Sequence, residues 1–261
     1  MKYSLRESIA EKPAEFAVFS DALSNLLVNR GLKTLATALA FISPDYGLHS
    51  HDPFLMRDMD KAVERVYKAI KNKEKIIIYS DYDADGIPGA VILHDAFKKI
   101  GIVNFENYIP HRHDEGFGLN HGAFDGFKEK GAKLLITIDC GIGNIDEVTY
   151  ANSLGIDVII TDHHELSEKI PPAFAILNPK LKDCKYPEKM LCGSGVIFKF
   201  IQAFLKKYGT EFGVPIGWEK WLLDLVGIAT LSDMVPLTGE NRVFAYYGLK
   251  VLKKTSRPGL S

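Results

Sequence analysis

Cysteine is scarce in this sequence, and long apolar runs are missing. The 261 residues contain three cysteines and no CxxC pair, which argues against a disulfide framework and against a structural zinc site. No apolar run is long enough to span a bilayer, and Met1 to Ser8 lack the apolar core of a signal peptide. We therefore expect a soluble protein in a reducing, cytoplasmic setting, without membrane contact.

Neither sign of charge is in excess. The chain has 32 Lys and Arg against 33 Asp and Glu, a formal net charge of −1. This balance gives no bulk signal for nucleic acid, so nucleic-acid binding would need a local patch or bound cations. The hydrophobic content of 46% and the charged content of 25% are those of an ordinary globular protein. At this length the chain can bury one large core or two modest ones.

Strands and helices alternate in the middle of the chain. The pattern predicts strands over 76–80, 103–109, 133–139 and 157–161, and helices over 89–100, 120–130 and 144–154. Ahead of them, Asp58 can cap a helix whose apolar residues follow a 3.6-residue period from Met59 to Ile70. Unbroken apolar strands between helices indicate an α/β fold, with a parallel β-sheet flanked by helices on both faces.

Two further regions frame this alternation. Residues 1–55 are mixed, with a short helical patch over 19–32, and we expect them to form an N-terminal extension of helix and loop. The strand–helix core then runs to about residue 180. The stretch 171–190 carries four prolines and reads as an ordered connector. A helical C-terminal part follows over about 190–256, with helices at 195–208, 218–231 and 242–253, and no second domain comes after it.

Acidic and imidazole side chains stand at the ends of these apolar runs. Asp81, Asp83 and Asp85 follow the first strand, Asp139 closes the third, Asp162, His163 and His164 follow the fourth, and Asp233 follows the apolar segment 227–232. Neighbouring parallel strands end at one sheet edge, where open α/β folds bind ligands. So many carboxylates would repel one another unless cations neutralised them. The pattern predicts a metal cluster, and carboxylates with imidazole suit Mn²⁺ or Mg²⁺.

Each of these motifs also has a simpler interpretation. The DxDxDG string at 81–86 also begins a calcium-binding loop, although loop position 12 is Ile92 instead of Glu and a strand precedes the motif. Asp139 could cap the helix that follows it, and Asp233 could be a polar cap residue. His163 and His164 are either surface histidines or a pair that points in two directions, one toward a metal and the other toward a substrate.

Two more segments offer groups for a phosphate or a base. Gly193-Ser194-Gly195 reads as a helix N-terminus with amides suited to a phosphate, or as a plain helix start. Position 192 is Cys, so the GxSxG hydrolase motif is not met, and no GxxxxGK[ST] P-loop is present. After the second strand, Arg112 could grip a phosphate bidentately and Phe117, which stands between glycines, could stack on a base. A solvated polar loop is the alternative there.

Together these motifs resemble the Asp-His-His (DHH) phosphoesterase superfamily. The resemblance is carried by 81–86 (DYDADG), 137–142 (TIDCGI), 161–165 (TDHHE) and 232–237 (SDMVPL). Flanking strings such as 115–119, 177–180 and 239–242 are closest to the RecJ family of 5′→3′ exonucleases specific for single-stranded DNA. The likeness runs from about residue 25 over nearly the whole chain, and residues 56–261 correspond to the DHH phosphoesterase domain.

The resemblance implies hydrolysis of a phosphodiester with two metal ions, Mn²⁺ or Mg²⁺. It implies one ion on Asp83, a second on Asp85, His163 and Asp233, and a bridge through Asp139. His164 would face the scissile phosphate, and Asp162 would orient the imidazoles. Arg112, Phe117 and the amides of Gly193, Ser194 and Gly195 would hold single-stranded DNA, in DNA repair or recombination beside repair or replication proteins that the residues do not identify.

The chain departs from the family pattern at two points. Many superfamily members have a histidine four residues before the first ligand Asp, where this chain has Tyr79. Either one metal has fewer protein ligands here, or Asp81 substitutes for the histidine. RecJ proteins continue into an accessory C-terminal domain, and this chain stops where the connecting helix would begin. Two other functions therefore stay open: a phosphoesterase of short oligonucleotides, cyclic dinucleotides or pyrophosphate, and a non-catalytic scaffold.

Overall fold

The structure, a computed structural model, describes residues 11–260 of the chain. The N-terminal octapeptide Met1–Ser8, predicted to lack a signal core, lies outside the described residues. The chain divides into two compact units, residues 1–50 and 51–261, where the sequence suggested an extension to about residue 55. No helix in the described part is long and apolar enough to cross a membrane.

The described part of the first unit is a set of short helices. They are η1 (Ala14–Val18), α1 (Asp21–Val28), α2 (Leu35–Ile42) and α3 (Tyr46–His49). Side chains of Ser20, Thr34 and Asp45 accept backbone N–H groups at the starts of the three α-helices, which fixes where each one begins. Phe16, Leu27 and Ala38 form a small buried core between them. The helical patch predicted at 19–32 is thereby confirmed for α1.

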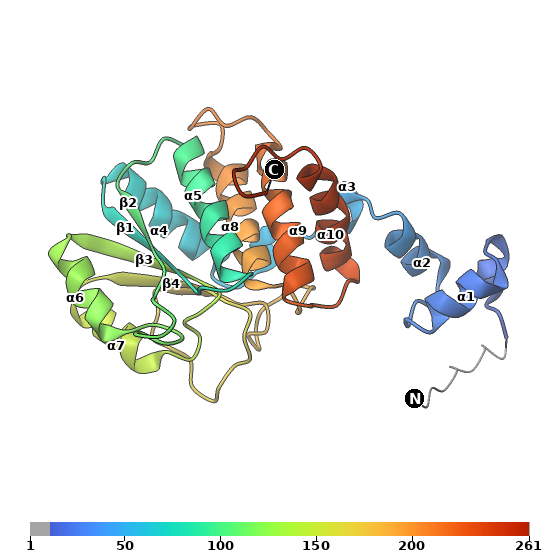
Figure 1. The fold of residues 1–261 in the computed structure, drawn as a ribbon, viewed down its shortest axis with the longest axis horizontal. Helices are drawn as coiled ribbons and strands as arrows, with labels where there is room; N and C mark the ends of the chain where they lie inside the picture. The colour runs from blue at the N-terminus through green and yellow to red at the C-terminus, as the bar shows by residue number, and fades with distance from the viewer. Residues whose placement is uncertain (1–10, 261) are drawn as a thin grey trace. The chain divides into compact units, whose positions relative to one another are not determined.

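A five-stranded parallel sheet organises the second unit (Figure 1). Its strands are β1 (Lys75–Ser80), β2 (Phe105–Tyr108), β3 (Ala132–Ile138), β4 (Asp157–Thr161) and β5 (Ala175–Leu177), in the order β2-β1-β3-β4-β5. Ile76, Ile77 and Ile78 of β1 are fully buried, as are most residues of β3 and β4, so both faces of the sheet are covered. The predicted α/β class with a parallel sheet is confirmed.

Helices cover both faces of the sheet. The helices of this unit are η2 (Pro53–Leu55), α4 (Met59–Lys71), α5 (Gly86–Lys99), α6 (His121–Glu129), α7 (Ile145–Ser153), α8 (Gly193–Tyr208), η3 (Trp218–Leu222), α9 (Leu223–Ser232) and α10 (Gly239–Leu252). α4, α5 and α8 pack on one face, and α6 and α7 pack on the other (Figure 1). α9 packs on α5 and α8, and α10 packs on α9, which makes the C-terminal part helical as expected.

The strand order reverses between β1 and β3. From β1 the chain passes through α5 to β2 on one side, whereas from β3 it passes through α7 to β4 on the other side. In open α/β sheets the loops after two such strands diverge and leave room for a ligand at their carboxyl ends. The residues that follow β1 and β3 are Asp81 and Asp139, so this reversal places both carboxylates at the point where a ligand is expected.

Some predicted elements differ from the observed ones. The strand predicted at 103–109 is observed only over the shorter range of β2, because Val103 is 90% exposed and lies outside the sheet. The proline-rich connector contains β5, which pairs with β4. The helix predicted at 218–231 is divided into η3 and α9. Asp58 precedes α4 as expected but does not cap it; it is left-handed, with φ 60°, and its carboxylate accepts from Ile176 N at 3.2 Å.

A buried ion pair joins α8 to α10. Lys199 Nζ lies 2.9 Å from Glu240 Oε1 and donates to His51 O at 2.7 Å, and both side chains are fully buried. Tyr186 OH also donates to Glu240. Burial lowers the pKa of Lys199, whereas the nearby charge of Glu240 favours the charged form of Lys199. A buried pair of this kind tolerates the loss of neither partner, and it fixes α8 against the helix that packs on α9.

Two glycines let α9 and α10 approach closely. A Cβ on Gly248 would lie 2.6 Å from Leu223 O and 2.7 Å from Gly227 Cα, and a Cβ on Gly227 would lie 2.9 Å from Gly248 Cα. These neighbours are backbone atoms, so they cannot rotate away. The crossing sets the position of α9, whose C-cap residue is Asp233.

We expect Gly248→Ala to lower the free energy of unfolding by about 1–3 kcal/mol, because the new methyl group forces the two helices apart. Gly126→Ala in α6 is the matched control: a Cβ there meets nothing within 4 Å, and alanine favours a helix over glycine by about 1 kcal/mol. Urea unfolding followed by circular dichroism measures both. Equal effects of the two substitutions would contradict the close crossing.

Candidate metal centre

Three acidic residues continue the hydrogen bonding of the sheet beyond its strands. Asp81 N donates to Ile138 O at 3.1 Å, Asp139 N to Thr161 O at 2.9 Å, and Asp162 N to Leu177 O at 3.0 Å. Asp81, Asp139 and Asp162 therefore lie side by side at the carboxyl edge of β1, β3 and β4, and all three are buried. The structure thus brings the strand-end residues together as the sequence predicts.

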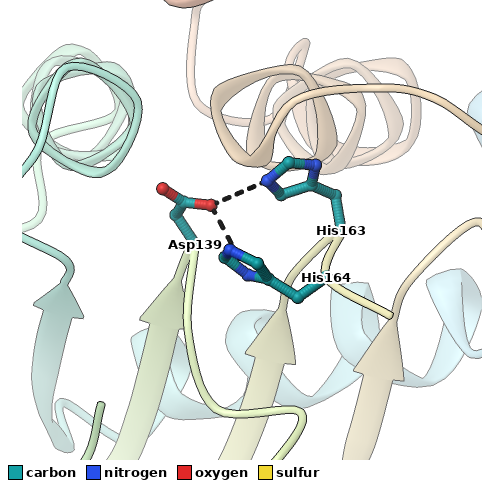
Figure 2. Close-up of side chains that lie close together, drawn as sticks. All are labelled: Asp139, His163 and His164. Carbon is teal, nitrogen blue, oxygen red and sulfur yellow. Dashed lines mark ion pairs between the residues drawn. The ribbon is translucent and has the colours of Figure 1, made fainter. Parts of the chain in front are cut away.

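Asp139 lies at the middle of the group. Its Oδ1 is 3.2 Å from His163 Nε2 and 4.0 Å from His164 Nδ1 (Figure 2). Its backbone is left-handed, with φ 61°, a conformation that costs a residue with a side chain on the order of 1–3 kcal/mol and that clusters at functional sites. Asp139 Oδ1 is buried without a hydrogen-bond partner among the described residues, as is Asp81 Oδ1. Such an oxygen needs a partner, which a cation can supply.

The ligand atoms form three overlapping sets. The sets are Asp81, Asp83 and Asp139; Asp85, His163 and Asp233; and Asp139, His163 and His164; within each set the atoms lie within 4.8 Å of one another. Asp139 belongs to two of them, as a bridging ligand would. Carboxylate oxygens with imidazole nitrogen suit hard and borderline divalent cations. The residues present therefore fit two divalent ions that share Asp139.

The loop after β1 is tightly built. Asp83 Oδ1 accepts the N–H groups of Asp85 and Gly86 at 2.8 and 2.9 Å. A Cβ on Gly86 would lie 2.5 Å from Asp81 O, so only glycine fits there. β1 precedes this loop and α5 begins at Gly86. The calcium-loop alternative, which needs a helix on each side of a 12-residue loop, is thereby excluded.

Without cations the carboxylates oppose one another's ionisation. Burial, followed by the charges of Asp85 and Asp83, raises the pKa of Asp139 to about 10. Burial also raises the pKa of Asp81 and of Asp233. A bound divalent ion would reverse these shifts by favouring the ionised form.

Asp162 differs from its neighbours because it is fully provided with hydrogen bonds. Its Oδ1 accepts from His163 N at 2.7 Å and lies 2.7 Å from His164 Nδ1, while Oδ2 accepts from Ile142 N at 2.9 Å. Burial alone would raise the pKa of Asp162, but these hydrogen bonds lower it. In return the hydrogen bond that His164 donates to Asp162 raises the pKa of His164. Asp162 thus orients the histidine pair and favours a positive charge on His164.

The N-terminus of α8 holds Asp85. Gly193 N donates to Asp85 Oδ2 at 2.6 Å, Ser194 N donates to Oδ1 at 2.8 Å, and Ser194 Oγ donates to Asp85 O at 2.6 Å. Helix N-terminal amides stabilise a carboxylate. This role differs from the phosphate binding predicted for Gly193, Ser194 and Gly195, because the first two amides already donate to Asp85. A Cβ on Gly193 would also lie 2.6 Å from Asp139 Oδ1.

Tyr79 stands where many superfamily members have a histidine. It is fully buried, and its hydroxyl donates to Gly118 O at 2.8 Å and accepts from Asn120 Nδ2 at 3.3 Å. The hydroxyl therefore anchors the loop before α6 and belongs to none of the three ligand sets. Asp81 lies with Asp83 and Asp139 in one of those sets, and its substitution for the histidine stays a prediction.

That anchored loop brings two predicted substrate residues to the centre. The Arg112 guanidinium lies 4.6 Å from the ring centre of Tyr82, which stands between Asp81 and Asp83. The rings of Phe117 and His164 meet edge to face, with 6.0 Å between their centres, and Phe117 is 61% exposed. Both side chains thus border the carboxylate cluster from one side and are accessible to a ligand.

Several supporting residues escaped the sequence analysis. Ser232 Oγ donates to Ala84 O at 3.0 Å and ties the end of α9 to the loop after β1. Asn178 is fully buried, and its Nδ2 donates to His164 O at 3.1 Å. The ring of Tyr82 packs against the guanidinium of Arg112. The only signal for Asn178 was its place in the family-like string 177–180; the other two depend on contacts between distant segments.

The raised pKa of Asp139 predicts how the metal-free protein responds to pH. At neutral pH its carboxyl is protonated in the folded state but ionised in the unfolded state. The contribution of Asp139 to the free energy of unfolding is therefore fully present below about pH 4 and is lost as pH rises toward 10. We expect the melting temperature in chelator to fall from pH 6 to pH 9, and to fall less in Asp139→Asn. Glu129→Gln, at an exposed position of α6, is the control. Parallel curves for all three proteins would refute the shift.

Comparison with known proteins gives the family. The profile described as "DHH family, N-terminal domain" matches residues 75–230. The single-stranded-DNA-specific exonuclease RecJ of Bacillus subtilis (strain 168) is 44% identical over 91% of this chain and 29% of the relative. That of Escherichia coli (strain K12) is 38% identical over 77% of this chain and 36% of the relative. The chain thus spans about a third of the length of these relatives.

Solved structures agree with these relatives. A crystal structure of exonuclease RecJ bound to manganese has 31% identity and a TM-score of 0.70, covering 78% of this chain and 50% of that one. RecJ in complex with Mn²⁺ from Thermus thermophilus has 25% identity and a TM-score of 0.76, covering 95% and 34%. The resemblance inferred from the motifs is confirmed. The chain belongs to the DHH family, and within that family it is similar to the RecJ exonucleases.

Proposed function

We propose that this chain is the catalytic core of a 5′→3′ exonuclease that hydrolyses single-stranded DNA with two Mn²⁺ or Mg²⁺ ions. The observation that carries the proposal is that Asp139 belongs to two of the three ligand sets, one with Asp81 and Asp83 and one with His163 and His164. A carboxylate that two ligand sets share would keep two divalent ions close together, as two-metal phosphodiester hydrolysis needs. The relatives named as RecJ, and the RecJ structures that contain Mn²⁺, support both the reaction class and the metal.

Each ion has its own ligands in this proposal. Asp81 and Asp83 would hold one ion, and Asp85, His163 and Asp233 would hold the other. Asp139 would be the ligand shared between them, because it lies in one set with Asp81 and Asp83 and in another with His163. When bound, the two ions lower the pKa of a water molecule and stabilise the negative charge of the attacking and leaving oxygens. The amides of Gly193 and Ser194 keep Asp85 in place for this task. Asp162 does the same for the histidine pair.

His164 supplies a positive charge beside the ions. Its Nδ1 lies 2.7 Å from Asp162 Oδ1, which fixes the ring and raises the pKa of His164. The side chain is 46% exposed, so a substrate can reach it. We assign to His164 the stabilisation of charge that develops on the scissile phosphate. Because the pKa of Asp162 is lowered, its carboxylate stays ionised and keeps that charge in place.

The proposed strand-binding groups are local. Arg112 on Tyr82 offers a bidentate grip for a phosphate, and Phe117 offers a face for a base. The net charge of −1 leaves the rest of the chain without a broad basic path. Since the substrate is DNA, we infer that the protein works in the cytoplasm in DNA repair or recombination, beside repair or replication proteins. A non-catalytic scaffold is disfavoured because every carboxylate and imidazole of the two ligand sets is present.

Single substitutions should separate the two ions. We expect calorimetric titration with Mn²⁺ to show two bound ions in the native chain and one in Asp83→Asn or Asp233→Asn. In Asp139→Asn binding should be weakened at both sites, because that oxygen is shared. Mn²⁺ should also raise the melting temperature of the native chain, since ions that bind only the folded state stabilise it. One binding event that Asp83→Asn and Asp233→Asn both abolish would contradict the two-set assignment.

Strand length and strandedness test the reaction itself. We expect the 261 residues with Mn²⁺ to shorten single-stranded DNA from its 5′ end, weakly and with poor processivity, and to resist blunt duplex. Because few cationic side chains hold the strand, affinity should be low and the rate should fall with salt only with the shallow slope of a few phosphate contacts. End-labelled oligonucleotides of graded length measure this, with Asp139→Asn as the inactive control. Turnover of dinucleotides, cyclic dinucleotides or pyrophosphate without cleavage of longer strands would replace the proposal by a small-substrate phosphoesterase.

A further inference from the structure

Three large apolar side chains stand exposed beside the carboxylate cluster. Ile87 is 41% exposed on the first turn of α5, Leu231 is 39% exposed near the end of α9, and Met234 is 87% exposed directly after Asp233. The hydrogen bond from Ser232 Oγ to Ala84 O joins the two segments that carry them. Single exposed apolar residues are common, but each of these three stands within two positions of a proposed metal ligand, Asp85 or Asp233. We call these three residues the apolar rim.

Met234 is also the left-handed residue that ends α9, directly after its C-cap Asp233. Its φ is 57°, in the left-handed region that residues other than glycine and asparagine rarely adopt. The next residue, Val235, is only 8% exposed and packs with Cys192 and Ala229. The turn at Met234 therefore sends Val235 inward and leaves the methionine side chain in solvent. Neither burial nor backbone preference accounts for a large apolar residue at this position.

The rim and Phe117 lie at opposite ends of one chain of contacts. Phe117 meets His164, whose ring centre is 4.7 Å from that of His163, and His163 Nε2 is 3.7 Å from Asp233 Oδ2. Met234 follows Asp233 in the chain. The ligand sets and Arg112 can take the phosphate of a nucleotide, which leaves its base and sugar in need of apolar surface on both sides.

We propose that the apolar rim binds the base of a nucleotide adjoining the scissile phosphate, and that Met234 is the residue that makes this contact. The inference rests on the proposed function and adds a specificity-determining residue to it. Three side chains are too few for a stable protein interface, which needs about 800 Å² on each partner. A single base is of the right size, and its faces are exposed only when the strand is unpaired.

Methionine suits a site that must accept every base. Its side chain is unbranched and flexible, and its thioether makes favourable contacts with aromatic rings of different shape. An enzyme that removes nucleotides regardless of sequence needs such an adaptable contact in place of hydrogen bonds to base edges. The rim also borders Asp233, so a base held there keeps its phosphate near the ligand sets.

Abasic substrates test this contact directly. Single-stranded oligonucleotides with an intact 5′ end are compared with the same strands carrying a tetrahydrofuran abasic residue at the first or second position, with Mn²⁺. We expect Met234→Ala to raise KM on the intact strand by about tenfold, the order of one base contact, with kcat changed less than about twofold. On the strand that lacks the contacted base, native chain and Met234→Ala should have equal KM.

Two further variants complete the experiment. Met234→Leu keeps an apolar side chain and should restore KM to near the native value. Ile216→Ala removes an equally exposed side chain between α8 and η3, outside the metal centre, and should change nothing. A KM for Met234→Ala that equals the native value on intact strands overturns the rim, as does an increase that persists on both abasic strands. Failure of the native chain to cleave any single strand overturns the proposed function, and the rim with it.

Discussion

The crowding of carboxylates around Asp139 is the constraint on which the rest of this structure depends. Asp81, Asp85, Asp139 and Asp162 are each 5% exposed or less and lie at one edge of one sheet. Burial and mutual repulsion make such a group unstable unless positive charge is placed against it. The fold places the histidine pair and the N-terminal amides of α8 against these carboxylates. It also arranges the carboxylates as ligands for two cations, which would supply the rest of the positive charge.

The helices explain why the charges meet where they do. The reversal of strand order between β1 and β3 opens the edge at Asp81 and Asp139. α8 then points its N-terminus at Asp85, and the close crossing of α9 and α10 at Gly227 and Gly248 sets the position of α9, whose C-cap is Asp233. The helical C-terminal part is thus no separate module. It supplies one ligand and the support of another, so the stability of the α9–α10 crossing and the geometry of the centre are linked.

The parts that could be predicted from the sequence depend on local pattern. Buried strands such as β1 and β4 are continuous apolar runs, and acidic residues at their ends converge by the geometry of a parallel sheet, so Asp81, Asp139 and Asp162 were found before the structure. β5 was missed because it has three residues within a proline-rich stretch and exists only through pairing with β4. The role of Gly193 and Ser194 was mistaken, because a free helix N-terminus and one that holds Asp85, 108 residues away, have the same sequence.

Backbone strain marks the same place as the charges do. Among the described residues four that are not glycine have positive φ: Asp58, Lys73, Asp139 and Met234. Asp58 and Lys73 lie at the two ends of α4, where such conformations close or open a helix. Met234 also ends a helix, as the residue after the C-cap of α9, whereas Asp139 ends no helix. Asp139 turns its carboxylate into the cluster, and Met234 turns an apolar side chain into solvent beside it. Strain of this kind persists only where the surroundings hold it, and here the sheet edge holds a metal-binding carboxylate and the α9 turn holds a base-directed side chain within one site.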